Sequence, residues 1–165
     1  MTGKEEKFFV VLREYTGYCE KAGALLDSVV SGETDPEEGY ESLRLLKRQS
    51  RDVQGRLIER LYKAYREPAC ANDARSMVVR MDGLIHGAQD IVNMPLVYHK
   101  EEPFHDGNTV MTKLSRWAVS DLVKIIGYKD DVEANMMKMD ARCQRIYNME
   151  ERGANTTRTT IQKLL

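Results

Sequence analysis

Asp82, His86 and Asp90 are three polar side chains spaced four residues apart near the middle of the sequence. In a helix this spacing places them in one stripe, each one turn from the next. Carboxylate oxygens and an imidazole nitrogen on adjacent turns are ligands that can hold a divalent cation. The stripe is therefore a candidate metal site. The alternative is the solvated flank of a surface helix, which the same spacing produces more often.

The neighbouring sequence predicts the helix that carries this stripe. Pro68 is expected to end the preceding helix, and Asn72 or Asp73 can cap the next one, because a short side-chain oxygen accepts hydrogen bonds from first-turn amides. Apolar residues at intervals of three and four then define an inner face: Ala74, Met77, Met81, Leu84, Ala88 and Ile91. We expect a helix over residues 73–94, with the polar stripe beside its inner face.

The same periodicity predicts four further helices, over about residues 4–30, 36–66, 109–126 and 131–165. Gly32 and Asp35-Pro36 separate the first two, because glycine favours a helix C-terminus and Asp-Pro supplies an N-cap and a first-turn proline. Trp117 is expected to face inward in the fourth helix. No segment alternates like a strand. We predict one all-α domain over residues 1–165, an antiparallel bundle of five long helices in which the last two extend the first three.

The fifth predicted helix has a methionine-rich inner face, which is typical of a core filled by flexible side chains. Its members are Val132, Met136, Met139, Cys143, Ile146, Met149, Gly153, Thr157 and Ile161. The corresponding face of the second helix is Leu43, Leu46, Ser50, Val53, Leu57, Leu61 and Ala64, and that of the first is Phe8, Leu12, Tyr15, Cys19, Ala22, Leu26 and Val29.

Composition indicates a globular protein without a global charge bias. Of 165 residues, 42% are hydrophobic, and 25 Lys and Arg balance 26 Asp and Glu, which does not point to nucleic acid as a partner. The longest apolar run, Phe8 to Leu12, is too short to cross a bilayer, and the N-terminus has no signal-peptide pattern. Cys19, Cys70 and Cys143 are too far apart for a zinc or redox motif. We therefore expect reduced cysteines and a cytoplasmic location.

Two other segments are rich in polar side chains. The predicted second helix carries eight basic residues, Arg44, Lys47, Arg48, Arg51, Arg56, Arg60, Lys63 and Arg66. They surround the helix instead of forming one patch, so a solvated surface is the simpler interpretation than an anion or nucleic-acid site. The loop over residues 98–108 contains His99, Glu101, Glu102, His105 and Asp106. Its spacing matches no metal motif, and loops are polar because they lie at the surface.

Several of these motifs together resemble a known family. Leu61-Tyr-Lys-Ala-Tyr65-Arg-Glu-Pro68, then Asp73, then Asp82-Gly-Leu-Ile-His86, is similar to a pattern of the PhoU-like phosphate-transport regulators. In that family a helix ends in a Leu…Phe…Pro pattern, and an Asp and an Asp-Asp-x-x-Asp motif follow. Glu151-Arg-Gly-Ala-Asn155 resembles the family's Glu-x-x-Ala-Asp motif near a terminal Leu-Leu. The resemblance covers almost the whole chain in helix order and length.

The resemblance implies a PhoU-like fold and a cytoplasmic, non-enzymatic regulator of inorganic phosphate uptake. The implied partner is a phosphate permease or its complex, so the protein would be peripheral to the membrane at most, and no nucleic acid is expected. Two alternatives stay open because helical bundles host many functions. One is a metal-dependent or nucleotide-related helical-bundle enzyme. The other is a nucleic-acid binder that uses the basic second helix.

The family carries acidic metal-binding motifs on facing helices, and this sequence departs from them. Gly83, His86 and Asn155 stand at acidic positions of the motifs, and Lys47 and Arg51 fall where the second helix would carry its acidic motif. We therefore expect no cofactor. A weak divalent site remains possible at Asp82, His86 and Asp90, with Glu151 and Asn155 as the remaining positions on the fifth helix. The favoured hypothesis is that Lys47 or Arg51 pairs with Asp82 or Asp90 in place of a metal, with His86 as a pH-sensitive neighbour.

The family normally continues with one more long helix, which this sequence does not contain. Without it, the resemblance implies an exposed apolar groove on the last two helices, with Met111, Trp117, Met136, Cys143 and Ile146 among its residues. Single globular domains rarely expose such a groove. We therefore expect a homo-oligomer, or a partner helix that fills the groove.

Overall fold

The computed structural model describes residues 2–98, 104 and 106–164. The possible loop ligands His99, Glu101, Glu102 and His105 lie outside the described residues. Five α-helices account for nearly all of the described chain: α1 (Gly3–Val30), α2 (Pro36–Ala64), α3 (Pro68–Tyr98), α4 (Asp106–Gly127) and α5 (Val132–Leu164). A short 3-10 helix, η1 (Tyr128–Asp130), joins the last two. The predicted all-α bundle is confirmed.

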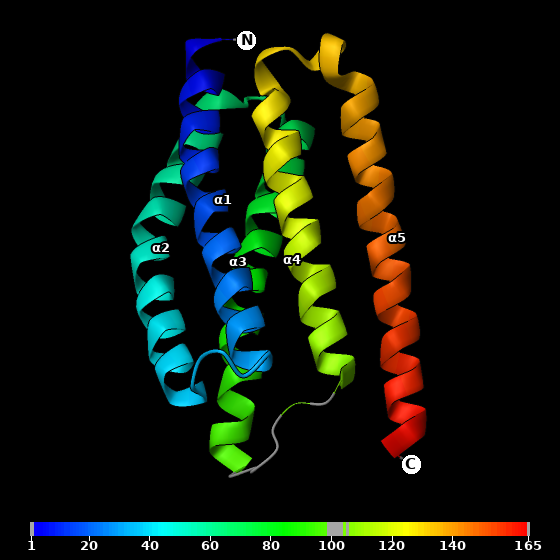
Figure 1. Cartoon of the computed structure of the whole chain (residues 1–165). Coiled ribbons are helices and arrows are strands. Elements are labelled where there is room, and N and C mark those ends of the chain that lie inside the picture. Colours follow the sequence, from blue (N-terminus) through cyan, green and yellow to red (C-terminus); the bar gives the residue numbers. More distant parts are fainter. Residues whose placement is uncertain (1, 99–103, 105, 165) are drawn as a thin grey trace.

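Helices α1, α2 and α3 pack against one another, α4 packs against α1, and α5 packs against α4 (Figure 1). Local sequence signals explain the first connection. Asp35 caps α2, because its Oδ1 accepts from the amide of Glu37 at 2.9 Å, and Pro36 follows as the first helical residue. Gly32 has a φ of +79°, a left-handed conformation that glycine adopts without steric cost. The chain thus reverses direction within a few residues.

The start and the end of α3 differ from the prediction. Pro68 was expected to end α2, but it is the first residue of α3, a position where the missing amide proton costs nothing. The helix also continues through Pro95 to Tyr98. Pro95 breaks one backbone hydrogen bond, but its ring is buried, and this apolar contact offsets part of the loss.

The core lies among α1, α2 and α3. The inner faces predicted for α1 and α2 are buried, apart from the partly buried Ala64. The inner face predicted for α3 is displaced around the helix. Leu84 and Ile91 are each 41% exposed, whereas the buried residues are Val78, Met81, Ile85, Ala88, Val92 and Pro95. The prediction failed there because α3 is apolar on a wide arc, of which α1 and α2 cover only part.

Trp117 was expected in the core and is half exposed. Helix α4 uses two other sides for packing: Thr112 contacts α1, and Asp121 contacts α5. Trp117 lies between these sides and faces outward. Similarly, Val132, Met136 and Ile161 were assigned to the inner face of α5, but they are exposed. Gly153 is the buried residue of α5, and it lies against Met111 of α4. Met139, Ile146 and Met149 of α5 are partly buried, and Gly153 alone is fully buried among the described residues of this helix.

Two buried carboxylates join the outer helices to the bundle. Asp27 of α1 accepts from Arg116 at 2.8 Å and from the Thr112 hydroxyl at 3.1 Å, both on α4. Asp121 of α4 accepts from Arg142 and Arg145 of α5, each at 2.6 Å. Charge-assisted hydrogen bonds of this kind are short and directional. Each helix contact made by α4 thus contains a charged pair with a buried carboxylate.

Candidate functional site

Asp82 connects the polar stripe of α3 to the core. The Tyr15 hydroxyl donates to Asp82 Oδ1 at 3.1 Å, and the Tyr15 side chain is completely buried. A buried hydroxyl without a partner is costly, so a carboxylate at the edge of the core stabilises tyrosine at this position. Asp82 therefore serves as the hydrogen-bond acceptor of a buried tyrosine, a role that the sequence did not lead us to expect. The signal was present, since a tyrosine on an inner face needs a polar partner.

His86 lies one turn further along α3, between Lys47 and Asp90. Its Nδ1 contacts Lys47 Nζ of α2, and its Nε2 lies 3.3 Å from Asp90 Oδ2. A neutral imidazole that accepts at Nδ1 and donates at Nε2 satisfies both neighbours. Both ring nitrogens are then engaged, and a metal ion would have to displace one partner. Lys47, His86 and Asp90 thus form a row of polar contacts on the surface, from α2 to α3.

The hypothesis was that Lys47 or Arg51 pairs with Asp82 or Asp90 in place of a metal. The structure shows a different set of contacts. Lys47 reaches His86, and Asp90 pairs with His86. Arg51 is exposed and makes no ion pair within the described part of the chain. The two acids of the stripe, Asp82 and Asp90, are instead satisfied by a tyrosine and a histidine. Pairing of these polar groups across α1, α2 and α3 could not be read from the spacing within α3.

The structure does not bring Glu151 and Asn155 to this stripe. Both are exposed on α5, which packs against α4, whereas Asp82 belongs to α3 in the other part of the bundle. Among the described residues, no three His, Cys, Asp or Glu side chains come close enough together to hold a metal ion. The polar stripe of α3 and the motif on α5 are therefore two separate surfaces.

We expect purified protein to retain no stoichiometric divalent metal at the α3 stripe, because His86 already contacts Lys47 and Asp90. Elemental analysis of protein prepared without chelators measures this directly. Lys47→Ala should free Nδ1 and raise the affinity for zinc or nickel, and adding His86→Ala should remove the gain. Stoichiometric metal in the wild type that disappears in an Asp82→Ala, His86→Ala variant would contradict the prediction.

Asp82 also affects two acidic groups of α1. Burial, followed by the charge of Asp82, raises the pKa of the Cys19 thiol from its ordinary value of 9.0 to about 12. The same two causes raise the pKa of the Tyr15 phenol well above its ordinary value of 10.0. Both groups are therefore protonated at neutral pH. Cys19 should be an unreactive core thiol, in contrast with the exposed Cys70.

These raised pKa values predict a loss of stability at high pH. Between pH 9.0 and about 12 the folded chain holds the Cys19 proton and the unfolded chain releases it. The free energy of unfolding should therefore fall as pH rises through this range, by up to roughly 1.4 kcal/mol per pH unit for each such group.

Thermal unfolding followed by circular dichroism from pH 8 upward measures this effect. The Tyr15→Phe variant should show a shallower decline above pH 10, because it lacks the phenol proton. Equal slopes for wild type and variant would show that Tyr15 does not contribute.

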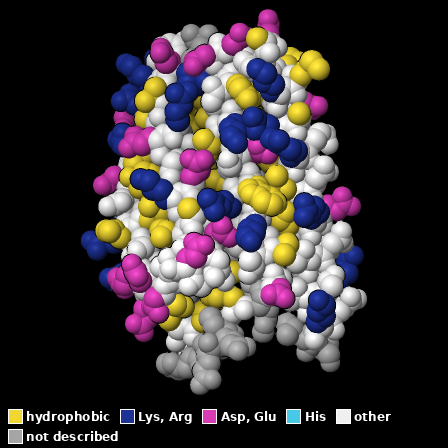
Figure 2. All heavy atoms as spheres, in the orientation of Figure 1, with side chains coloured by type: hydrophobic (Ala, Val, Ile, Leu, Met, Phe, Trp, Pro, Cys, Tyr) yellow, Lys and Arg dark blue, Asp and Glu magenta, His cyan; other side chains and the backbone are white. Residues whose placement is uncertain are grey.

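The basic residues of α2 are partly neutralised by acidic neighbours. Arg44 pairs with Glu41 at 2.6 Å, Arg56 with Glu14 at 2.7 Å, and Lys63 with Glu59. On the face of the molecule drawn in Figure 2, basic and acidic side chains lie among one another over most of the surface. A phosphate backbone is bound best by a continuous basic stripe, so this distribution does not favour nucleic acid.

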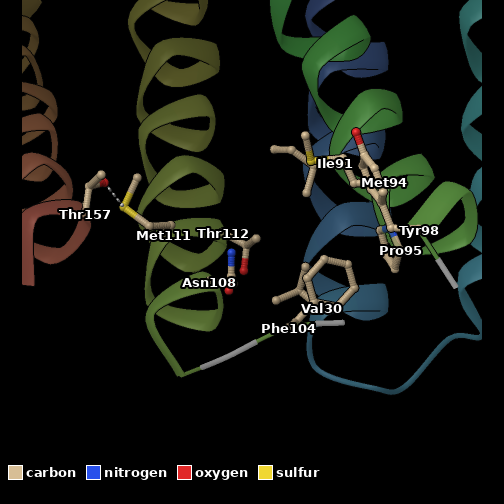
Figure 3. A pocket seen from close by; sticks show the side chains of 10 residues that line it. All are labelled: Val30, Ile91, Met94, Pro95, Tyr98, Phe104, Asn108, Met111, Thr112 and Thr157. Carbon is tan, nitrogen blue, oxygen red and sulfur yellow. Dashed lines mark hydrogen bonds between the residues drawn. The ribbon is translucent and has the colours of Figure 1, made fainter. Parts of the chain in front are cut away.

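An apolar recess of about 520 Å³ opens where the C-terminal end of α3 approaches α4 and α5. Figure 3 shows Ile91, Met94 and Tyr98 on one side of the recess and Met111 and Thr157 on the other. Its wall on α3 continues along the exposed flank of that helix, because Leu84, Ile91 and Tyr98 are seven residues apart. We call these three residues with Met94 the α3 flank. These side chains form a row of exposed apolar groups beside the recess.

Comparison with family models, curated proteins and solved structures finds no match for this chain. The PhoU-like resemblance therefore rests on the sequence motifs given above. No helix in the described part of the chain is both long enough and apolar enough to cross a membrane.

Proposed function

We propose that this protein is a non-enzymatic cytoplasmic regulator of inorganic phosphate uptake that binds a phosphate permease or its complex. The link to phosphate comes from the resemblance of the segments 61–86 and 151–155 to PhoU-like regulators. The five long helices, packed as a bundle that α4 and α5 extend, agree with the fold which that resemblance implies.

The single structural observation that supports a binding role is the α3 flank. Leu84, Ile91, Met94 and Tyr98 are between 41% and 68% exposed and lie on one side of α3, next to the apolar recess. Solvent-exposed apolar side chains in a contiguous row mark interaction surfaces more often than isolated ones do. An amphipathic helix or loop of the permease, presenting apolar side chains at helical intervals, fits such a surface.

The experiment is complementation of a strain that lacks this protein, with radioactive phosphate uptake measured in phosphate-poor and phosphate-rich medium. Wild type should restore normal uptake, and Ile91→Asp should fail because it places a charge in the proposed contact. Val79→Asp is the matched control, since Val79 is also an exposed apolar residue of α3, at 58% against 41% for Ile91, but belongs to another side of the helix. Affinity capture should recover the permease with wild type and Val79→Asp only. Unchanged uptake after deletion in both media would refute the proposed function.

A further inference from the structure

Besides the α3 flank, the molecule has a second exposed flank on α5, and six of its eight residues are arranged symmetrically about its middle. Moving from Met136 to Ile161, every third or fourth residue lies on this flank, and the members are Met136, Asp140, Cys143, Tyr147, Glu150, Ala154, Arg158 and Ile161. We call it the α5 stripe. It is distinct from the side that carries Arg142, Arg145 and Gly153 toward α4. Each member of the stripe is exposed, except the half-buried Cys143.

Residues at equal distances from the middle of the stripe, near Asn148 and Met149, are complementary to each other. Met136 and Ile161 are both large and apolar, and Cys143 and Ala154 are both small. The position that mirrors Asp140 is Thr157, and the next residue is Arg158, whose long side chain can reach Asp140 of an antiparallel second copy. Tyr147, a hydrogen-bond donor, mirrors Glu150, an acceptor. Two copies of this helix laid antiparallel would therefore place each residue against a fitting partner.

Two charged members of the stripe, Asp140 and Arg158, have no ion-pair partner among the residues that the structure describes. Asp140 makes no ion pair in the described part of the chain, and the residues one turn away on α5 are Met136 and Gln144. Arg158 donates only a weak hydrogen bond to Asn155, at 3.4 Å, and Ala154 precedes it by one turn. Ion pairs at helical spacing usually satisfy such residues on a solvated helix. Their absence leaves both charges available to another chain.

The fold leaves this surface accessible. Helix α5 lies at the edge of the molecule and packs against α4 and η1 (Figure 1). Met136, in the second turn of α5, and Tyr147, near its centre, are 60% and 64% exposed, values that are high for large apolar side chains. The stripe extends over about seven turns. A surface of this length, apolar at both ends and charged between them, is suited to another helix.

We infer that the α5 stripe is the contact surface of a homodimer in which the α5 helices of two copies pair antiparallel. Two-fold symmetry makes every contact occur twice: Asp140 of one copy faces Arg158 of the other, and the reverse. Met136 packs against Ile161, and the Tyr147 hydroxyl reaches the Glu150 carboxylate. The pairing buries the exposed apolar ends of the stripe. This inference does not depend on the proposed role in phosphate uptake, because it uses a different helix and flank.

Charge reversal tests the pairing by sedimentation equilibrium. In the Asp140→Arg variant, the new arginine faces Arg158 of the other copy at both symmetric contacts. In the Arg158→Asp variant, the new aspartate faces Asp140 of the other copy. Each single variant should weaken dimerisation roughly tenfold or more, because two favourable pairs become two repulsive ones. The double variant Asp140→Arg, Arg158→Asp restores opposite charges and should dimerise like wild type. Arg152→Asp, an exposed change on the opposite flank of α5, is the control and should have no effect.

Disulfide trapping tests the antiparallel alignment. In a Cys70→Ser background, Ala154→Cys places a thiol opposite Cys143 of the second copy, and oxidation should give a covalent dimer linked through positions 143 and 154. Without Ala154→Cys, oxidation should leave monomers on a non-reducing gel. A wild-type monomer at all measured concentrations would overturn the inference. So would dimerisation of either single charge variant as strong as that of wild type, or a disulfide link between the two copies of Cys143.

Discussion

Asp121→Ala is expected to release α5 from the rest of the molecule. Asp121 is 5% exposed and accepts from two arginines of α5, and Arg142 of this pair is itself largely buried. Removing the carboxylate leaves both arginines without their ion-pair partner, and Arg142 then keeps only its hydrogen bond to the Tyr128 hydroxyl. Gly153 is the one fully buried residue among those described in α5, so we expect the remaining contacts with α4 not to compensate for this loss.

Hydrogen exchange resolved by peptide measures the outcome. Amides of α5 should lose protection in Asp121→Ala, whereas amides of α1, α2 and α3 should exchange as in wild type, because their core does not include Asp121. Asp52→Ala, a change to an exposed carboxylate on α2, is the control and should leave both regions unchanged. Full protection of α5 in Asp121→Ala would show that apolar packing alone holds this helix.

Leu57→Ala is expected to cause a large loss of global stability. Leu57 is completely buried among α1, α2 and α3. Shortening a buried leucine removes its apolar contacts and leaves a cavity, which costs about 2–5 kcal/mol. Because domains of this size unfold with roughly 5–15 kcal/mol, the variant would lose a substantial share of its stability.

Leu45 offers a matched control within the same helix. It is the same residue type, but it is 56% exposed. Leu45→Ala should change the free energy of unfolding by no more than about 0.5 kcal/mol. Urea denaturation of wild type and both variants, followed by circular dichroism, gives the comparison. Similar losses for Leu45→Ala and Leu57→Ala would mean that the core is not located where the structure places it.

Apolar periodicity predicted the α1 and α2 faces and failed on α3 for a physical reason. On α2 the row of apolar residues is narrow and flanked by charges, so the row and the buried side coincide; on α1 the apolar residues are more widely spread, but α2, α3 and α4 all pack against this helix, so its predicted row is buried too. On α3 apolar residues cover a wider arc, and Leu84, Ile91 and Ile85 all fit a helical repeat. Only the positions of α1 and α2 decide which part of that arc is covered. The uncovered part became the α3 flank.

By itself, the amino-acid sequence determined the five helices, the turn at Gly32 and Asp35, and the buried sides of α1 and α2, because capping and periodicity act between residues close in the chain. Tertiary structure alone decided the polar contacts. Lys47 meets His86 across 39 residues, and Arg116 meets Asp27 across 89. Spacing within a helix sets the direction of a side chain about the helix axis, but the neighbour that lies in that direction is set by how the helices pack.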